Sequence, residues 1–252
     1  MSTNPFSLSG RTAVVTGGRR GIGQGATRAL LAAGADIVVL ARQEVPAEDR
    51  DYAASLGRNL TEHRVDLGDR SATEQVVQAV LNEHQVDILV NNAGVQARHA
   101  AVDFPMQDWE RVIDINLRAV FQLCQDFGRP MLQRGEGKII NIASLTSFQG
   151  GLNIPAYAAS KGAVAQLTKS LCNEWAGQGV NVNALAPGYI ATDINAELRD
   201  DEARYAELSG RIPAGRWGTP ADIGHAVVFL ASPGASYVHG EVLVVDGGWM
   251  AY

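Results

Sequence analysis

The stretch RTAVVTGGRRGIG, residues 11–23, joins a short apolar run to four closely spaced glycines. Its apolar residues are continuous rather than alternating, which is typical of a strand that is covered on both faces of a parallel sheet. The glycines then allow a tight turn into a helix expected over residues 21–33. This strand, turn and helix predict an α/β fold.

Comparable apolar runs recur along the chain and alternate with helical patterns. We expect further strands at 35–42, 59–67, 86–92, 137–144, 179–187 and 240–248, and further helices at 71–84, 108–133, 155–177 and 220–231. This alternation predicts a doubly wound (Rossmann) sheet of seven parallel strands, with right-handed crossovers and helices on both faces. The chain contains no linker-like, repetitive or low-complexity segment, so we expect one domain over residues 1–252.

Residues 190–219 break the alternation. The segment has a helical middle and is too long for an ordinary connection between two elements. We therefore expect a helical lid near residues 190–215 that closes over a substrate pocket.

The composition excludes several classes of protein. A formal net charge of −6 gives no long-range attraction for nucleic acid or for an anionic membrane surface. Cys124 and Cys172 lack metal-ligand spacing, so we interpret them as buried thiols in a reducing compartment and expect no metal site. The first residues do not resemble a signal peptide, and no apolar run is long enough to span a bilayer. We expect a soluble, cytoplasmic protein.

The glycine-rich segment TGGRRGIG, residues 16–23, lies at the first strand-to-helix connection, where dinucleotides bind in such sheets. A site specific for NAD normally has an acidic residue about 20 positions further on. Here Ala41 and Arg42 occupy that place. Arg42 and Arg20 could bind a 2′-phosphate, which favours NADP, while NAD stays possible if both arginines are ordinary surface residues.

Tyr157 and Lys161 are four residues apart in a helical stretch rich in Ala, Ser and Gly, so they share one face of the helix. A phenol is a poor base at neutral pH, but a nearby ammonium group and an oxidised nicotinamide ring both favour the phenolate. Such a pair is suited to acid/base chemistry between an alcohol and a ketone.

These features, together with NNAG (91–94), DINL (114–117), Ser144 and PGYIAT (187–192), resemble the classical short-chain dehydrogenase/reductase family over essentially the whole chain. The resemblance implies that Tyr157 exchanges a proton with the substrate oxygen. It implies that Lys161 lowers the pKa of Tyr157 and holds the nicotinamide ribose. It also implies that Ser144 binds the substrate oxygen, and that Asn116 interrupts its helix to hold a water molecule linked to Lys161.

The resemblance further implies the residues that line the cofactor. Asp66 and Leu67 correspond to residues that contact the adenine ring. Gly188 could equally be a residue that only forms a turn. The full set is Gly17, Arg19, Arg20, Gly21, Ile22, Gly23, Ala41, Arg42, Asp66, Leu67, Asn92, Ala93, Gly94, Tyr157, Lys161, Pro187, Gly188, Ile190 and Thr192.

The strings at 147–164, 173–176 and 211–222 are similar to a subgroup of this family that acts on sugar acids, the gluconate 5-dehydrogenase and 2-deoxy-gluconate 3-dehydrogenase types. Members of the second type commonly use NAD, whereas Arg42 leads us to expect NADP. A sugar acid needs cationic or polar partners in the pocket. Besides Ser144 and Tyr157, the candidates are Arg98, Gln149 and Asn153, although Arg98 could equally be a solvated loop residue. Arg211 and Arg216 fit a packing turn better.

Two other functions remain open. A 3-ketoacyl thioester reductase would share the glycine loop with Arg20, but the sequence has no basic cluster for an acidic carrier protein. A catalytically silent nucleotide-binding redox sensor would have no need for a tuned phenol. The resemblance also implies a homotetramer. Trp249 and Tyr252 could mark a subunit contact, with an ordinary core role for Trp249 as the alternative.

Overall fold

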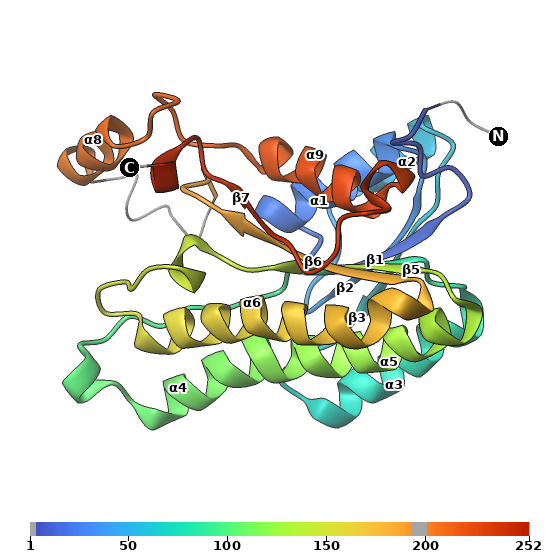
Figure 1. Cartoon of the computed structure of the whole chain (residues 1–252), viewed down its shortest axis with the longest axis horizontal. Helices are drawn as coiled ribbons and strands as arrows, with labels where there is room; N and C mark the ends of the chain where they lie inside the picture. Colours follow the sequence, from blue (N-terminus) through green and yellow to red (C-terminus); the bar gives the residue numbers. More distant parts are fainter. Residues whose placement is uncertain (1–3, 193–200, 252) are drawn as a thin grey trace.

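The computed structural model describes residues 4–192 and 201–251, and Figure 1 shows their arrangement. Seven parallel strands form one sheet in the order β3-β2-β1-β4-β5-β6-β7. The strands are β1 (Thr12–Thr16), β2 (Asp36–Ala41), β3 (Leu60–Arg64), β4 (Ile88–Asn91), β5 (Gly137–Ile142), β6 (Val180–Pro187) and β7 (Val242–Val245). All seven predicted strands and the doubly wound architecture are thus confirmed.

Helices cover both faces of the sheet (Figure 1). One layer holds α1 (Gly21–Ala32), α2 (Ala47–Ser55) and α9 (Pro220–Ala231), and the other holds α3 (Arg70–Glu83), α5 (Ala119–Arg134) and α6 (Pro155–Trp175). Two shorter helices, α4 (Met106–Ile113) and α8 (Glu202–Gly210), lie towards one end of the molecule (Figure 1). In the described part of the chain, no helix is both long and apolar enough to cross a membrane.

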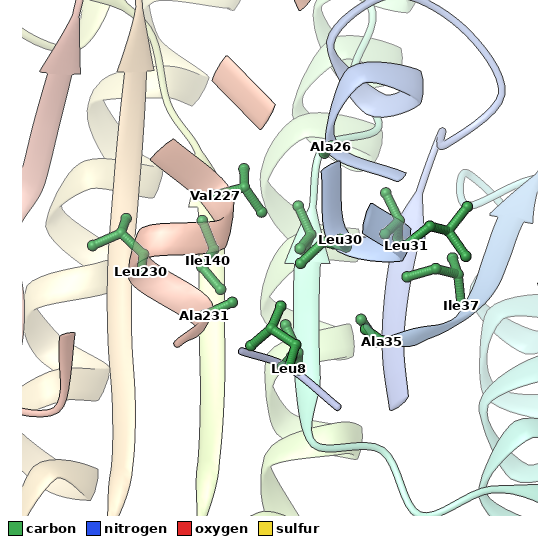
Figure 2. Packing of buried hydrophobic residues seen from close by; sticks show 14 of the residues in the cluster. Leu8, Ala26, Leu30, Leu31, Ala35, Ile37, Ile140, Val227, Leu230 and Ala231 are labelled. Atoms are coloured by element: carbon green, nitrogen blue, oxygen red, sulfur yellow. The ribbon is translucent and has the colours of Figure 1, made fainter. Parts of the chain in front are cut away.

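Each face of the sheet has its own apolar core. Figure 2 shows the core beneath α1 and α9, in which Leu30 and Val227 are fully buried. These two helices pack closely because Gly25 and Gly224 face each other: a Cβ on Gly224 would lie 2.4 Å from the carbonyl oxygen of Gly25. The opposite core, beneath α5 and α6, contains Cys124 and Cys172. Both cysteines are buried free thiols, as predicted, and burial raises the pKa of Cys124 to about 12.

Two helical regions differ from the sequence prediction. Helix α2 was not predicted because it has no apolar stripe: its buried residues are Asp49 and Ala53. It is held instead by tertiary bonds, since Gln24 and Arg28 both donate to the Asp49 carboxylate. The helix predicted over 108–133 begins earlier, at Met106, and a π-helical turn at Asp114–Arg118 divides it into α4 and α5.

The predicted lid region is partly described. Its helical middle is confirmed as α8, whereas residues 193–200 lie outside the described residues. The chain then returns through a parallel bridge between Ile190 and Gly218 before it enters α9.

Candidate active site

The glycine loop forms a cradle in front of α1. Gly17 and Gly21 have φ angles of +64° and +53°, which L side chains rarely adopt. A Cβ on Gly23 would lie 2.2 Å from the Gly17 carbonyl oxygen and 2.5 Å from Asn92 Nδ2. The helix begins after Arg20, whose side chain makes no capping bond. The first amides of α1 therefore face the loop without a side-chain cap, which suits a pyrophosphate.

A cavity of about 340 Å³ opens at the carboxyl ends of the strands. Its walls come from the segments that follow β1, β2, β3 and β4, which is where the strand order reverses and nucleotides bind in such sheets. The lining includes most of the predicted cofactor residues: Gly17, Arg19, Arg20, Gly21, Ile22, Gly23, Ala41, Arg42, Asp66, Leu67, Asn92, Ala93, Gly94, Tyr157, Lys161 and Thr192.

Seven lining residues were missed by the sequence prediction: Leu40, Gln43, Val65, Val95, Gln96, Ile115 and Ile142. Most of them adjoin a predicted residue, so extending each motif by one or two positions would have found them. Ile142 is different, because it is an ordinary apolar residue at the end of β5 and carries no signal of its own.

Cations line the part of the cavity beyond β2. Ala41 ends this strand, and Arg42 follows it as an exposed residue. Arg19 also lines the cavity, and its Nε donates to the carbonyl oxygen of Glu44 at 3.0 Å. The nearby carboxylate of Glu44 is paired with Arg64 and does not line the cavity. Among the described lining residues, Asp66 is the single carboxylate, and it lies after β3 and accepts a bond from the Gly68 amide at 2.9 Å. The arrangement fits a 2′-phosphate better than a free ribose hydroxyl.

Thr16 joins the two loops that face the nucleotide site. The amides of Asn92 and Ala93 both donate to Thr16 Oγ1, each at 2.9 Å. Asn92 Nδ2 donates in turn to the carbonyl oxygens of Thr16 at 2.9 Å and Gly17 at 3.3 Å. The glycine loop and the NNAG segment are therefore fixed relative to each other.

Asn116 is fully buried in the π-helical turn, so the predicted interruption of the helix is confirmed. Its Oδ1 accepts from the Val95 amide at 2.8 Å, and its Nδ2 donates to the Val95 carbonyl at 2.9 Å and to Ser160 Oγ at 3.2 Å. Asn116 thus ties the loop after β4 to α6, the helix that carries Tyr157 and Lys161.

Lys161 and Tyr157 lie on one face of α6 and both line the cavity. The ammonium of Lys161 lies 5.7 Å from the centroid of the Tyr157 ring, and it donates to the carbonyl oxygen of Ile142 at 2.6 Å. Ser144 follows the end of β5 and accepts from the Thr146 amide at 3.2 Å. The fold therefore brings the four predicted catalytic residues close together: Tyr157 and Lys161 line the cavity, Ser144 is hydrogen-bonded to Tyr157, and Asn116 is bonded to Ser160 of the same helix.

The pKa values differ in one respect from the expectation. Lys161 was expected to lower the pKa of Tyr157, but in this protein burial raises the pKa of that phenol, and hydrogen bonding to Ser144 lowers it in part. Burial also lowers the pKa of Lys161 to about 8. Burial disfavours the charged form of both groups. The lowering of the Tyr157 pKa by Lys161 together with an oxidised nicotinamide concerns the protein with its cofactor bound and stays a prediction.

Comparison with known proteins agrees with this geometry. A family model described as enoyl-(acyl carrier protein) reductase matches residues 17–250. The chain belongs to the short-chain dehydrogenase/reductase family. It is an NAD(P)-dependent oxidoreductase that acts on CH–OH groups.

Three relatives within this short-chain family illustrate the similarity. The 2-dehydro-3-deoxy-D-gluconate 5-dehydrogenase of Bacillus subtilis is 51% identical over 98% of this chain and 97% of its own. The structure of a candidate NAD(P)-dependent gluconate 5-dehydrogenase from Beutenbergia cavernae, with NADP at low occupancy, is 49% identical, with a TM-score of 0.95 over 99% of this chain and 100% of that one. A gluconate 5-dehydrogenase from Burkholderia cenocepacia, in complex with NADP and tartrate, is 39% identical, with a TM-score of 0.90 over 98% of both chains.

Three predicted cofactor residues of this short-chain dehydrogenase do not line the cavity. Pro187 is buried at the end of β6, and Ile190 belongs to the core beneath α1 and α9. Gly188 packs against the chain instead, since a Cβ there would lie 2.7 Å from Asp246. Of the residues predicted in this turn, Thr192 lines the cavity. The contact of Pro187, Gly188 and Ile190 with a bound cofactor stays a prediction.

Of the predicted substrate residues, Tyr157 lines the cavity, whereas Arg98, Gln149 and Asn153 lie outside its lining. Arg98, Gln149 and Asn153 are exposed, and Asn153 has a φ angle of +62°. The carbonyl oxygen of Asn153 accepts from the His99 amide at 3.0 Å, so the two loops that carry Arg98 and Asn153 meet beside the site. Their contact with a substrate stays a prediction.

Trp249 has the core role that the sequence left as the alternative to a subunit contact. Trp249 is 6% exposed and packs in a cluster with Leu145, Leu208, Ile212 and Trp217. The short helical turn at Trp249–Ala251 presents the indole to the interior of its own chain. Tyr252 lies outside the described residues.

Proposed function

We propose that this protein interconverts a secondary alcohol and a ketone on a six-carbon sugar acid, with Tyr157 as the general acid/base. The observation that carries the proposal is that Tyr157 and Lys161 line the same cavity as the glycine loop. A bound nicotinamide would supply or accept the hydride there. The protein's own groups would then handle the proton.

In the direction of ketone reduction, the raised pKa of Tyr157 keeps its hydroxyl protonated, so it can donate to the oxygen that becomes the alcohol. Ser144, which is hydrogen-bonded to Tyr157, would hold the same substrate oxygen. In the direction of oxidation, Tyr157 must accept the proton. The amine of Lys161, with its pKa near 8, would ease this step by stabilising the phenolate while charged.

The sugar-acid class is supported by the names of the relatives. The proteins from Bacillus subtilis and Burkholderia cenocepacia are both named as dehydrogenases of gluconate or a gluconate derivative, and both align over nearly the whole chain. We propose NADP as the favoured cofactor because Arg42 follows Ala41 at the end of β2, where an acidic residue would favour NAD.

The test is the nicotinamide absorbance of the purified protein with NADP and NAD, against gluconate, 5-ketogluconate, 2-deoxy-gluconate, 2-dehydro-3-deoxy-gluconate and a ketoacyl thioester. We expect turnover of at least one sugar acid, and a loss of about a hundredfold or more in kcat for Tyr157→Phe. Tyr52→Phe, on α2 and outside the cavity lining, is the matched control. Turnover of the thioester alone would reject the proposed substrate class, and an unchanged kcat in Tyr157→Phe would reject the role of the phenol.

We also propose a cytoplasmic homotetramer, as the family resemblance implies. Phe121 on α5 is 44% exposed and Tyr237, before β7, is 97% exposed, and such exposed aromatic residues support subunit contacts. Light scattering coupled to size-exclusion chromatography measures the mass directly, and a monomer at assay concentration would reject this state.

A further inference from the structure

An aromatic cluster lies beside the catalytic residues and is not used by the chemistry proposed above. Tyr189 packs on Trp249 and Trp217, with ring centroids 4.8 Å and 5.2 Å apart. Tyr205 of α8 stacks on Trp217, with ring centroids 5.3 Å apart. These four rings, here called the aromatic cluster, join α8, the turn after β6 and the turn that follows β7.

The aromatic cluster is connected directly to the active site. Trp249 and Trp217 share a buried contact group with Leu145, the residue after Ser144. Tyr189 is in the same turn as Thr192, which lines the nucleotide cavity. Figure 1 shows α8 and the C-terminal turn side by side at one end of the molecule, and the amide of Ala214 donates to the Gly247 carbonyl oxygen at 2.9 Å.

Arg211 completes the aromatic cluster. Its guanidinium carbon lies 4.0 Å from the centroid of the Trp249 ring, and its side chain is exposed. In the described ranges, 4–192 and 201–251, no carboxylate pairs with Arg211, whereas Arg204 pairs with Glu207 at 2.6 Å and Arg216 pairs with Asp222 at 2.9 Å. Among the described residues, the stack on Trp249 leaves the N–H donors of Arg211 available to another partner.

The charge around Tyr189 has one dominant sign. Burial raises the pKa of this phenol, and the positive charges of Arg204, Arg211 and Arg98 act against that rise. The loop after β4, α8 and the α8–α9 connection therefore each contribute an arginine whose charge acts on this phenol. The charge of Arg204 is offset by Glu207, so the net cationic character comes from Arg98 and Arg211.

We propose that Arg211, stacked on Trp249, binds the carboxylate of the substrate, with the Tyr189 hydroxyl as a second donor. This inference rests on the proposed sugar-acid function, and it names the part of the protein that binds the acid group of the substrate. A planar guanidinium can hold a carboxylate through two parallel hydrogen bonds, which fixes orientation as well as affinity. The anchored acid would direct its secondary alcohol towards Ser144 and Tyr157.

The sequence favoured a packing turn for both Arg211 and Arg216, and the bonds of Arg216 support that interpretation for this residue. The guanidinium of Arg216 donates to both carboxylate oxygens of Asp222, and Asp222 also accepts from Thr219 in the capping box of α9. Arg211 has no such structural bond in the described part of the chain. The two arginines, five positions apart, therefore have different roles.

The experiment compares Arg211→Gln with Arg204→Gln, which removes a neighbouring arginine whose charge is already paired. The substrate is the sugar acid that the wild type turns over best, and its primary amide serves as a neutral competitor. For Arg211→Gln we expect KM for the acid to rise by about tenfold to a hundredfold, the usual effect of losing a charge-assisted hydrogen bond, with a much smaller change in kcat. The inhibition constant of the amide should stay within about twofold, because the amide carries no charge for Arg211 to bind.

The outcomes separate the two proposals. If the wild type turns over no sugar acid, the proposed function fails and this inference fails with it. If the wild type turns over an acid but Arg211→Gln leaves its KM unchanged, the function stands and the inference is overturned. Equal increases in KM for Arg211→Gln and Arg204→Gln would also overturn it, because they would point to a general effect of surface charge. Trp249→Leu should raise KM in the same way as Arg211→Gln, since it removes the ring that positions the guanidinium, and an unchanged KM would exclude that positioning.

Discussion

Replacing Asn116 with alanine should destabilise the whole active-site end of the protein. The substitution removes three hydrogen bonds in a fully buried position, two with Val95 and one with Ser160. At about 1 kcal/mol of net stability for each bond, the expected loss is about 3 kcal/mol. For a chain of this size, that corresponds to a decrease in Tm of about 6–12 °C.

A double-mutant cycle isolates the link between the π-helical turn and α6. Ser160 Oγ accepts from Asn116 and donates to the Tyr157 carbonyl oxygen at 2.7 Å, so Ser160→Ala removes both bonds. One bond is shared by the two residues. The combined loss in Asn116→Ala/Ser160→Ala should therefore fall short of the sum of the single losses by about 1 kcal/mol.

The assays are urea denaturation and thermal unfolding followed by circular dichroism. Asn173→Ala, at an exposed position near the end of α6, is the control and should stay within about 0.5 kcal/mol of the wild type. If Asn116→Ala behaved like this control, or if the two single losses were additive, Asn116 would not be the tie between the loop after β4 and α6.

Two further predictions concern the cofactor and the buried amine. Arg42→Asp should weaken binding of NADPH by about tenfold or more and leave NADH binding equal or tighter, because the 2′-phosphate loses a cationic partner and the ribose hydroxyl gains an acceptor. Fluorescence titration measures the affinity for both cofactors. The control is Arg50→Gln, which should change neither affinity, because Arg50 pairs with Glu62 outside the cavity lining. An unchanged preference would remove the argument for NADP. Lys161 has a pKa lowered to about 8 in the folded protein from 10.5, so between these values the unfolded chain binds more protons and stability rises with pH. Relative to Lys161→Met, the wild type should gain about 2 kcal/mol of unfolding free energy between pH 8 and 10, and a flat difference would show that the amine is not desolvated.

The sheet was predictable because strands covered on both faces have continuous apolar runs, such as those of β1 and β6. The elements that were missed depend on contacts between distant residues. Helix α2 has no amphipathic pattern and is held by bonds to the Asp49 carboxylate. The π-helical turn keeps the helical spacing of apolar residues, so periodicity alone cannot separate α4 from α5.

The candidate site divides in the same way. Residues within recognisable motifs, such as the glycine loop and the YAASK segment, were placed in the cavity from the sequence. Trp249 and Arg211 could not be placed, because their roles arise from a contact between two segments 38 positions apart in the chain. The raised pKa of Tyr157 in the protein without its cofactor could not be predicted for a related reason: sequence spacing places a charge nearby but does not reveal how much water the fold removes.

The hydroxyl oxygen of Thr16 accepts hydrogen bonds from two amides of the opposite loop, and Thr16 itself ends the strand that leads into the glycine loop. Such an arrangement makes the halves of the nucleotide cleft move as one body. Binding of a ligand in this cleft would cost little conformational entropy, and a displacement of one loop would also displace the other. A valine at this position would match the shape of threonine but would separate the two walls.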